Sequence, residues 1–358
     1  MLIKEITKSI NIITTSTMPY ICGPTFTSIE RANYFSNNNF DVKLIVSYLS
    51  EKDQNILFRK YLYQHINKNI NIDFYDGFLY KSTIFTFNNI FSKCNNNDII
   101  LLEEPEHLLF FNPNNIYGIL HTNYTQIISL NFGKIIAYLL HLYNNLIVSK
   151  VYKLMTISKS IEYYGSKIYP IHGIRDIFFD INHSIYDECL FYYCGQIIIN
   201  FKGLNILPKL NINIDIYGNG PDVKTLKKLD TNKLLHFKGS ISLASNSAGN
   251  RELVNNSQRK YDINDLLKYK CYISPSINEG LCTAIVMHKF VIIPNCIYNE
   301  IFIDKIKFPN VLIYNNNTEL LNHIKFVSDI NNQPVHKNYD QFKWDNCNKC
   351  LCDIIMNS

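Results

Sequence analysis

Two series of short apolar runs, separated by segments of helical periodicity, constrain the fold of this chain most strongly. In the first half the runs occupy residues 11–14, 42–48, 99–102, 116–121 and 152–157, and helical segments lie between them at 27–37 and 132–146. In the second half they occupy residues 190–194, 212–217, 234–237, 271–274, 290–293 and 311–314. Short apolar runs in alternation with helices are typical of buried parallel strands in βαβ units. The sequence therefore predicts two α/β domains.

The length of 358 residues also favours two domains over one. We expect the first domain over residues 1–183 and the second over 184–335, joined near the polar stretch 179–188. Within the second domain, residues 240–260 are rich in Ser, Asn and Ala, which predicts a surface insertion or a disordered loop. Residues 336–358 carry apolar side chains at helical spacing, which predicts a closing C-terminal helix.

Composition narrows the possible partners of the chain. The net charge of +5 is spread along the sequence, and no nucleic-acid-binding motif is present, so nucleic acid is not an expected partner. Ten cysteines without a recognisable secretion signal indicate a reducing compartment. No apolar run reaches the roughly 18 residues that a spanning helix needs. Residues 58–68 and 135–153 have the mixed aromatic, aliphatic and basic character of membrane-surface helices, with a core-packed helix as the alternative for each.

Polar clusters follow two of the predicted strands in the first half. The first contains Glu103, Glu104, Glu106 and His107, and the second contains His121, Asn123 and Tyr124. Ligands of open α/β sheets bind beyond the carboxyl ends of the strands. We expect His121 to hydrogen-bond a sugar hydroxyl and to titrate near neutral pH, with a structural histidine as the alternative. The carboxylates are so close in sequence that we expect only one or two of them to be functional.

The second half contains two signals for phosphate binding. Gly218 and Gly220 follow a strand, and glycines there allow the backbone to approach a phosphate. The complete G-x-G-x-x-G fingerprint is absent, which argues against a nicotinamide-dependent dehydrogenase. Lys202 stands at the start of a predicted helix, where an ammonium group can neutralise a departing diphosphate. A solvated helix lysine is the alternative.

A third signal is the segment 274–284, which joins a strand to a helix. Glu279 can accept hydrogen bonds from sugar hydroxyls or cap the helix, and the amides that follow can face a phosphate. Those amides belong to Gly280, Leu281, Cys282 and Thr283. In the first half, Gly23 lies in the first strand-to-helix loop and allows close backbone approach to a substrate. Cys347, Cys350 and Cys352 lack the further ligands of a metal site, so no metal is predicted.

With these segments the chain resembles the digalactosyldiacylglycerol synthases of glycosyltransferase family 4. The blocks E-E-P-E-H-L at 103–108 and H-T-N-Y at 121–124 are the specific ones, whereas K-G at 202–203 and G-N-G at 218–220 occur more widely. The resemblance implies an α/β GT-B fold, in which two Rossmann-like domains face a central cleft and a C-terminal helix crosses back to the first. It also implies a retaining transferase that moves galactose from UDP-galactose to a galactolipid, without metal or another cofactor.

The resemblance assigns roles to residues of this sequence. Catalytic roles are implied for His121, Lys202 and Glu279. Binding of the UDP-sugar donor is implied for Gly23, Gln196, Lys202, Gly218, Gly220, Glu279, Gly280, Leu281, Cys282 and Thr283. The acceptor side is implied for Glu104, Glu106, His107, Asn123 and Tyr124. A lipid acceptor further implies a peripheral location on an intracellular membrane such as the plastid envelope, and otherwise the cytoplasm.

Two departures from the family pattern leave alternatives open. Gln196 stands where the family has a basic residue, so one of two diphosphate-binding cations is missing. The helix after residue 284 is about one turn shorter than the family's, so Met287 stands at the spacing of the second Glu of an E-x7-E pattern. The alternative function is a catalytically weakened homologue that binds lipid or nucleotide-sugar. A transferase of the same family with another donor or a soluble acceptor is a further one.

Overall fold

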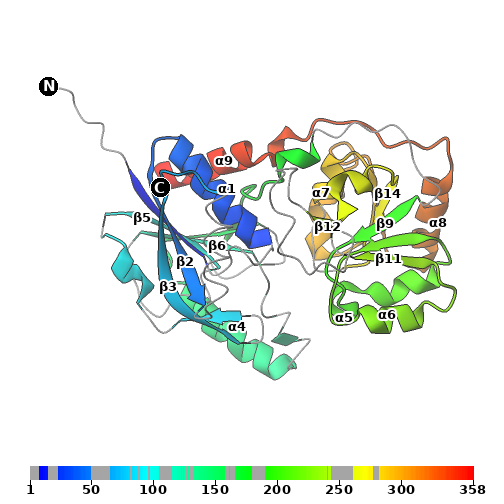
Figure 1. Ribbon diagram of the computed structural model, residues 1–358, viewed down its shortest axis with the longest axis horizontal. Helices are drawn as coiled ribbons and strands as arrows, with labels where there is room; N and C mark the ends of the chain where they lie inside the picture. Colours follow the sequence, from blue (N-terminus) through cyan, green and yellow to red (C-terminus); the bar gives the residue numbers. More distant parts are fainter. Residues whose placement is uncertain are drawn as a thin grey trace. The chain divides into compact units, whose positions relative to one another are not determined.

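The computed structural model divides the chain into two compact units, which are described separately (Figure 1). Unit 1 comprises Met1–Gly173 and Gln341–Ser358, and unit 2 comprises Ile174–Asp340. The residues that the structure describes are 8–14, 23–49, 65–80, 83–86, 89–95, 97–104, 115–121, 123, 125, 128–129, 133–157, 161, 166–179, 190–239, 241–242, 261–276 and 282–358.

Unit 1 contains an eight-stranded sheet in the order β4-β3-β2-β1-β5-β6-β7-β8. Its strands are β1 (Ser9–Thr14), β2 (Asp41–Leu49), β3 (Asn71–Tyr80), β4 (Thr83–Phe85), β5 (Ile99–Glu103), β6 (Ile116–Leu120), β7 (Lys153–Thr156) and β8 (Lys167–Ile168). Neighbouring strands are parallel except for the antiparallel pair β3 and β4. All the strands predicted in the first half are present. The sequence did not predict β3, because polar residues interrupt its apolar ones, nor the short strands β4 and β8.

Two helices pack together on the core of unit 1. Helix α1 (Gly23–Asn37) contacts β1 and β2 and also the C-terminal helix α9 (Trp344–Met356). Leu351 and Ile355 of α9 belong to the same buried cluster as Ile12 and Ala32, and Asn348 Nδ2 donates to the Glu30 carbonyl at 3.4 Å. Figure 1 shows α9 in red beside α1. The prediction that the C-terminal helix returns to the first domain is therefore confirmed.

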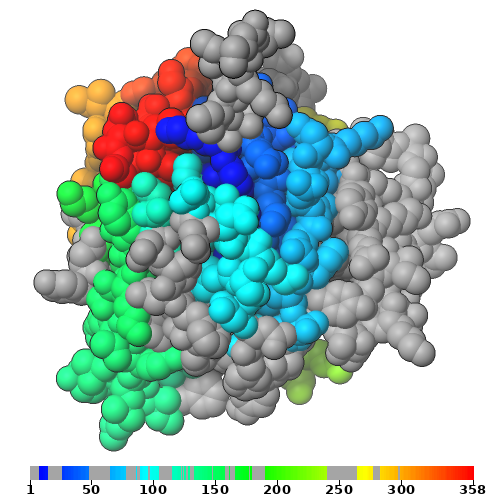
Figure 2. Space-filling model, turned by 90° about the vertical axis from the view of Figure 1, so that its left-hand side faces the viewer, coloured from blue at the N-terminus to red at the C-terminus, as the bar shows by residue number. Residues whose placement is uncertain are grey.

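Helix α4 (Lys134–Val148) faces the solvent with its apolar side. Its buried positions include Ala137, Asn144 and Val148, whereas Ile135 is 79% exposed. In Figure 2 the green atoms of α4 lie at the lower left of the face shown. The core-packed alternative is therefore wrong for this segment, while residues 58–64 of the other candidate segment lie outside the described residues. None of the described helices is long and apolar enough to cross a membrane.

Unit 2 contains a six-stranded sheet in the order β11-β10-β9-β14-β15-β16, with every neighbouring pair parallel. These strands are β9 (Phe191–Cys194), β10 (Ile214–Tyr217), β11 (Leu235–Gly239), β14 (Cys271–Ile273), β15 (Phe290–Pro294) and β16 (Val311–Tyr314). They match the six runs predicted in the second half. The α-helices of this unit are α5 (Ile199–Lys202), α6 (Val223–Leu229), α7 (Cys282–Val286) and α8 (Asn317–Ser328).

Short elements complete the described chain. The 3-10 helices are η1 (Ile90–Lys93) in unit 1 and η4 (Asp176–Phe178), η5 (Leu204–Lys209), η6 (Ile263–Leu266), η7 (Ile297–Phe302) and η8 (Asp340–Phe342), the last spanning the return to unit 1. Strands β12 (Ile241–Ser242) and β13 (Tyr261–Asp262) pair with each other. Apart from β12, the predicted insertion at 240–260 lies outside the described residues.

Candidate functional site

Three buried charged or polar side chains meet at the carboxyl ends of β5 and β6 in unit 1. Glu103 is the last residue of β5 and His121 directly follows β6, and these neighbouring parallel strands end at the same sheet edge. The Glu103 carboxylate pairs with Nη1 of Arg31, on α1, and with Nε2 of His121. The side chains of Arg31 and Glu103 are fully buried, and that of His121 is 2% exposed. Arg31 Nη2 also donates to the Ile171 carbonyl at 2.9 Å.

The charges in this cluster keep Glu103 ionised. Burial alone raises the pKa of Glu103, but the charges of Arg31 and His121 and their hydrogen bonds hold that pKa below its ordinary value. A carboxylate at Nε2 places the hydrogen of a neutral His121 on that nitrogen and leaves Nδ1 as an acceptor. His121 Nδ1 is buried and has no hydrogen-bond partner in the described part of the chain. In the neutral ring, Nδ1 can therefore accept a hydrogen bond from a hydroxyl group.

A second histidine lies beside this cluster. The His172 ring is 6.2 Å from the His121 ring and 5.5 Å from the Trp344 ring of α9. Burial, together with the charges of His121 and Arg31, lowers the pKa of His172 to about 3, so His172 is neutral near pH 7. Gly173 makes this packing possible, because a Cβ there would lie 2.8 Å from Trp344 Cγ. Helix α9 thus closes directly over the histidine pair.

The structure places only part of the predicted acceptor side. Glu104 is buried with a φ of +60°, and its N–H donates to the Ile119 carbonyl at 2.9 Å. Asn123 is half-buried just after β6. The predictions for Glu106, His107 and Tyr124 lie outside the described residues. The sequence did not predict Arg31, although an arginine four residues from both Thr27 and Phe35 on the predicted helix shares their buried face.

In unit 2 two loops run against each other beyond β9 and β10. The Gly195 N–H donates to the Tyr217 carbonyl at 2.9 Å, and the Ile197 N–H donates to the Asn219 carbonyl at 2.9 Å. A Cβ at Gly218, whose φ is +138°, would collide with the Gly195 carbonyl. A Cβ at Gly220 would collide with the Ile197 carbonyl. The two glycines therefore have a structural reason as well as the predicted phosphate-binding one.

Lys202 lies next to these loops as the last residue of α5. It is only 2% exposed, so the alternative of a solvated helix lysine is wrong. Its Nζ is 4.8 Å from the centroid of the Phe201 ring. Gly203 follows with a φ of +64°, and a Cβ there would lie 2.8 Å from the Pro275 carbonyl oxygen. The structure thus brings the predicted cation next to the segment that follows β14.

A buried polar network stabilises the end of β10. The Tyr269 hydroxyl donates to the Asp215 carboxylate, and the hydroxyls of Tyr217 and Tyr269 are 2.7 Å apart. Lys238 Nζ is 3.2 Å from the same carboxylate of Asp215. These bonds fix the strand that leads into Gly218, because Asp215 and Tyr217 belong to β10.

The remaining donor-side predictions are only partly placed. Gln196 is exposed, Gly23 opens α1, and Cys282 and Thr283 open α7. Glu279, Gly280 and Leu281 lie outside the described residues. Helix α7 has five residues, and Met287 beyond it is fully buried, so no acid occupies that position. The described residues contain no group of three or more His, Cys, Asp or Glu side chains that could hold a metal ion.

Sequence comparison finds relatives over most of the chain, although no family model matches it. Digalactosyldiacylglycerol synthase 1, chloroplastic, of Arabidopsis thaliana is 27% identical over 380 residues. That alignment covers 89% of this chain but only 44% of the relative, so the chain spans less than half of that protein. Digalactosyldiacylglycerol synthase 2, chloroplastic, of Glycine max is 25% identical over 401 residues, which cover 95% of this chain and 81% of the relative.

Solved structures agree in fold at low sequence identity. The complex of Anabaena HepE with UDP and glucose has a TM-score of 0.63 at 11% identity and covers 98% of this chain and 100% of its own. Sucrose-phosphate synthase from Thermosynechococcus elongatus has a TM-score of 0.67 at 11% identity, with 98% of both chains covered. These neighbours are GT-B glycosyltransferases. The chain is therefore a relative of the digalactosyldiacylglycerol synthases with the GT-B fold.

Proposed function

We propose that this chain is a retaining glycosyltransferase that moves galactose from UDP-galactose to a galactolipid and so makes a digalactosyl lipid. The observation that carries the proposal is the similarity to digalactosyldiacylglycerol synthases over 89% and 95% of the chain. The chemistry at the strand ends of both units is consistent with it. The acceptor we expect is monogalactosyldiacylglycerol.

In this proposal unit 2 holds the donor. The turns at Gly218 and Gly220 let the main chain approach the diphosphate closely, and Lys202 supplies a positive charge as UDP departs. A buried ammonium suits that role because a low-dielectric surrounding strengthens its attraction to phosphate oxygens. Glu279 and the amides up to Thr283 would bind the sugar and the phosphate. No metal or other cofactor is required by this scheme.

Unit 1 supplies the acceptor side in the same proposal. Glu103 and Arg31 hold the His121 ring in one orientation, and its buried Nδ1, which has no partner among the described residues, would accept a hydrogen bond from a sugar hydroxyl. A histidine in that state can orient the hydroxyl and accept its proton. Glu104, Glu106, His107, Asn123 and Tyr124 would contact the galactolipid headgroup. We propose a peripheral location on the plastid envelope, since the relatives are chloroplastic proteins and the acceptor is a lipid.

Radiolabelled UDP-galactose and monogalactosyldiacylglycerol in detergent micelles test the activity. We expect label in a digalactosyl lipid, and the anomeric configuration of the new linkage gives the stereochemical outcome. His121→Ala should reduce turnover by about 100-fold or more while UDP binding stays unchanged. His141→Ala is the control, because His141 lies on α4 and hydrogen-bonds Asn145 rather than Glu103. Equal turnover of the His121 variant and the wild type would contradict the role of His121.

A second candidate function is that of a catalytically weakened homologue that binds lipid or nucleotide-sugar. It is favoured by the exposed Gln196 and the buried Met287, which stand where the family pattern has charged residues. Each lost hydrogen bond to a charged group costs about 1.5–3 kcal/mol. Retained UDP binding without any lipid-borne label would support this candidate. Gln196→Arg should then raise UDP affinity, since it restores a cation beside the diphosphate.

A further inference from the structure

The outward side of α4 is a continuous apolar surface. Ile135, Ile136, Tyr138, Leu139, Leu142, Tyr143 and Leu146 are between 44% and 79% exposed. At 3.6 residues per turn these side chains fall within an arc of about 160°. A helix packed on a globular core shows the reverse pattern, with its apolar side buried and its polar side in water. Exposed apolar surfaces of this kind mark interaction sites.

The acidic and basic residues in the sequence on either side of this apolar surface are all positive. Residues 107–161 contain no Asp or Glu, whereas they contain Lys134, Lys150, Lys153 and Lys159. Lys134 and Lys150 are exposed at the two ends of α4. Such a combination attracts an anionic surface and repels a cationic one. Aliphatic side chains, tyrosines and flanking lysines on one helix are also the composition of helices that lie in a membrane interface.

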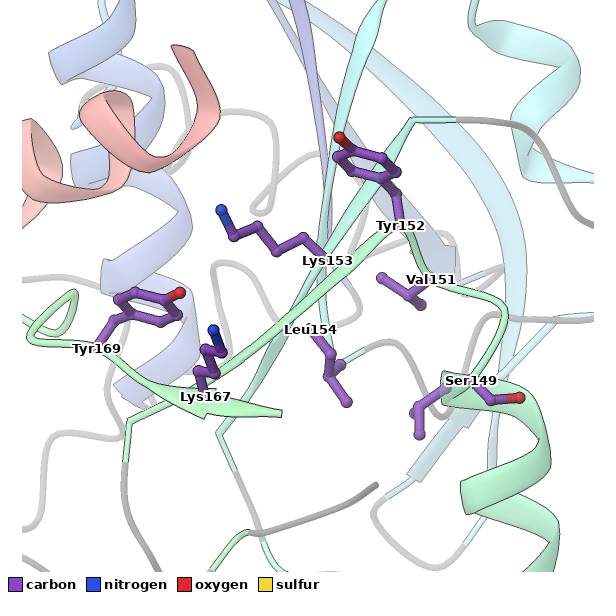
Figure 3. A pocket seen from close by; sticks show the side chains of 8 residues that line it. Ser149, Val151, Tyr152, Lys153, Leu154, Lys167 and Tyr169 are labelled. Atoms are coloured by element: carbon purple, nitrogen blue, oxygen red, sulfur yellow. The ribbon is translucent and has the colours of Figure 1, made fainter. Parts of the chain in front are cut away.

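A pocket of about 320 Å³ opens beyond the C-terminal end of α4. Val148, Ser149, Val151, Tyr152, Lys153, Leu154, Lys167 and Tyr169 line it. Figure 3 shows the Lys153 and Lys167 ammonium groups and the Tyr169 hydroxyl pointing to the same side of the pocket. The register of β7 and β8 explains this, because Met155 pairs with Lys167 and alternate strand residues share a face.

In the described part of the chain, neither pocket lysine forms an ion pair with an Asp or Glu side chain. Lys153 Nζ donates to the Ser358 hydroxyl at 2.7 Å. A compact anion can therefore bind between the two ammonium groups and accept a further hydrogen bond from Tyr169.

We propose that α4 docks unit 1 on an anionic membrane, with its apolar side in the interface and the lysine pocket around the anionic headgroup of one lipid. The docking lipid is chemically distinct from the galactolipid acceptor, which carries no charge. The occupant is a bilayer because an exposed helix with aliphatic and aromatic side chains, with only lysines among the charged residues before and after it in the sequence, matches a fluid anionic surface. The proposal rests on the peripheral location proposed above, and it names the surface and the lipid charge involved.

Vesicle co-sedimentation of the full chain tests the apolar side. We expect the wild type to bind vesicles of phosphatidylcholine with phosphatidylglycerol more tightly than vesicles of phosphatidylcholine alone. Leu139→Glu/Leu142→Glu should weaken binding by about tenfold or more. The control is Leu321→Glu/Ile330→Glu in unit 2, where the side chains are 50% and 81% exposed, against 60% and 48% on α4. Equal losses in both double variants would overturn the docking role of α4.

The pocket is tested by Lys153→Gln/Lys167→Gln. This variant should lose the preference for anionic vesicles by about tenfold while it keeps the weaker binding to neutral ones. Lys224→Gln/Lys228→Gln on the exposed side of α6 is the control and should keep the preference. Inorganic phosphate at millimolar concentration should not displace the protein from vesicles. If phosphate displaced the wild type completely and this effect disappeared in Lys153→Gln/Lys167→Gln, the pocket would bind a free anion. That result would overturn the lipid assignment.

Two further measurements separate this proposal from its rivals. Sedimentation velocity without lipid should give a monomer, and a dimer that the α4 variant dissociates would assign this surface to a second copy of the chain instead. Galactosyl transfer in detergent micelles reports on the proposed function independently. Vesicle binding without galactosyl transfer would overturn the proposed enzymatic function and support docking. Transfer without vesicle binding would support the function and overturn docking.

Discussion

Different interactions stabilise the carboxyl ends of the parallel strands in the two units. In unit 1 the polar cluster depends on side-chain charges, because Glu103 binds both Arg31 and His121 in a buried setting. In unit 2 the corresponding edge depends on main-chain fit, because Gly218 and Gly220 lie against the carbonyls of the neighbouring loop. A charge cluster can orient a hydrogen-bonding side chain, whereas packed glycine loops let the backbone approach an anion closely. The difference thus matches a division between acceptor chemistry and donor binding.

The largest effect should come from breaking the charge cluster with Arg31→Met. Removal of one partner from a buried ion pair costs about 3–5 kcal/mol of the free energy of unfolding. The chain has a single tryptophan, Trp344 on α9, so its fluorescence during chemical denaturation reports on unit 1. The cost arises because Glu103 stays charged in a buried site.

Two comparisons sharpen this prediction. Lys93→Met breaks the exposed ion pair with Asp73, whose side chains are 32% and 39% exposed, and should cost less than about 1 kcal/mol. Arg31→Met/Glu103→Met should recover part of the loss, since it leaves no buried carboxylate without the Arg31 cation. If the double variant lost more unfolding free energy than the two single variants lose together, the pair would not act through charge.

The main-chain fit of unit 2 is tested by Gly218→Ala. The new Cβ collides with the Gly195 carbonyl and the φ of +138° disfavours alanine, so we expect a cost of about 3 kcal/mol. Hydrogen exchange over 214–239 measures the local stability, and calorimetry with UDP measures binding. Gly239→Ala is the control, because its φ is +87° but no atom lies within 4 Å of the added Cβ, so only about 1 kcal/mol should be lost. Equal losses of stability in the Gly218 and Gly239 variants would mean that the positive φ alone, without close packing, requires glycine at position 218.

The charge on the donor side is tested by Lys202→Met. Loss of a charge-assisted hydrogen bond to phosphate should weaken UDP binding by about 1.5–3 kcal/mol, which is roughly 10- to 100-fold in affinity. Lys209→Met is the matched control, since Lys209 is exposed at the end of η5. Calorimetric titration with UDP gives both affinities. A Lys202 variant that binds UDP as tightly as the wild type would remove the phosphate role and leave only a packing role.

The strands were predictable from the sequence because their apolar runs are uninterrupted, as in 99–102 and 290–293. The exceptions in unit 1 are β3, which has polar residues within it, and the short strands β4 and β8. The sequence also placed His121 and Gly218 at strand ends, but it put Lys202 at the start of a helix, whereas Lys202 is the last residue of α5. It did not predict the contact of Arg31 with Glu103, because two residues 72 positions apart meet only through the packing of α1 on the sheet. The outward side of α4 was equally hidden, since periodicity gives an apolar stripe but not the direction it faces.

The last effect, and the one most specific to unit 1, is a pH dependence through His172. The folded protein keeps His172 neutral down to pH about 3, whereas the unfolded chain protonates it near 6.5, so the unfolded state binds more protons between these values. The stability contribution is complete above pH 6.5 and is lost as the pH falls, by up to about 1.4 kcal/mol per pH unit. His172→Phe keeps a ring against Trp344 and His172→Gln does not, yet both remove this titration. In both variants the unfolding free energy, measured by Trp344 fluorescence, should therefore fall less steeply between pH 6.5 and 4 than in the wild type. This holds whatever their stability at neutral pH. A slope as steep as that of the wild type in both variants would mean that the acid sensitivity of unit 1 comes from groups other than His172, such as the carboxylates of Glu103, Asp73 and Asp98, whose lowered pKa values also favour folding at higher pH.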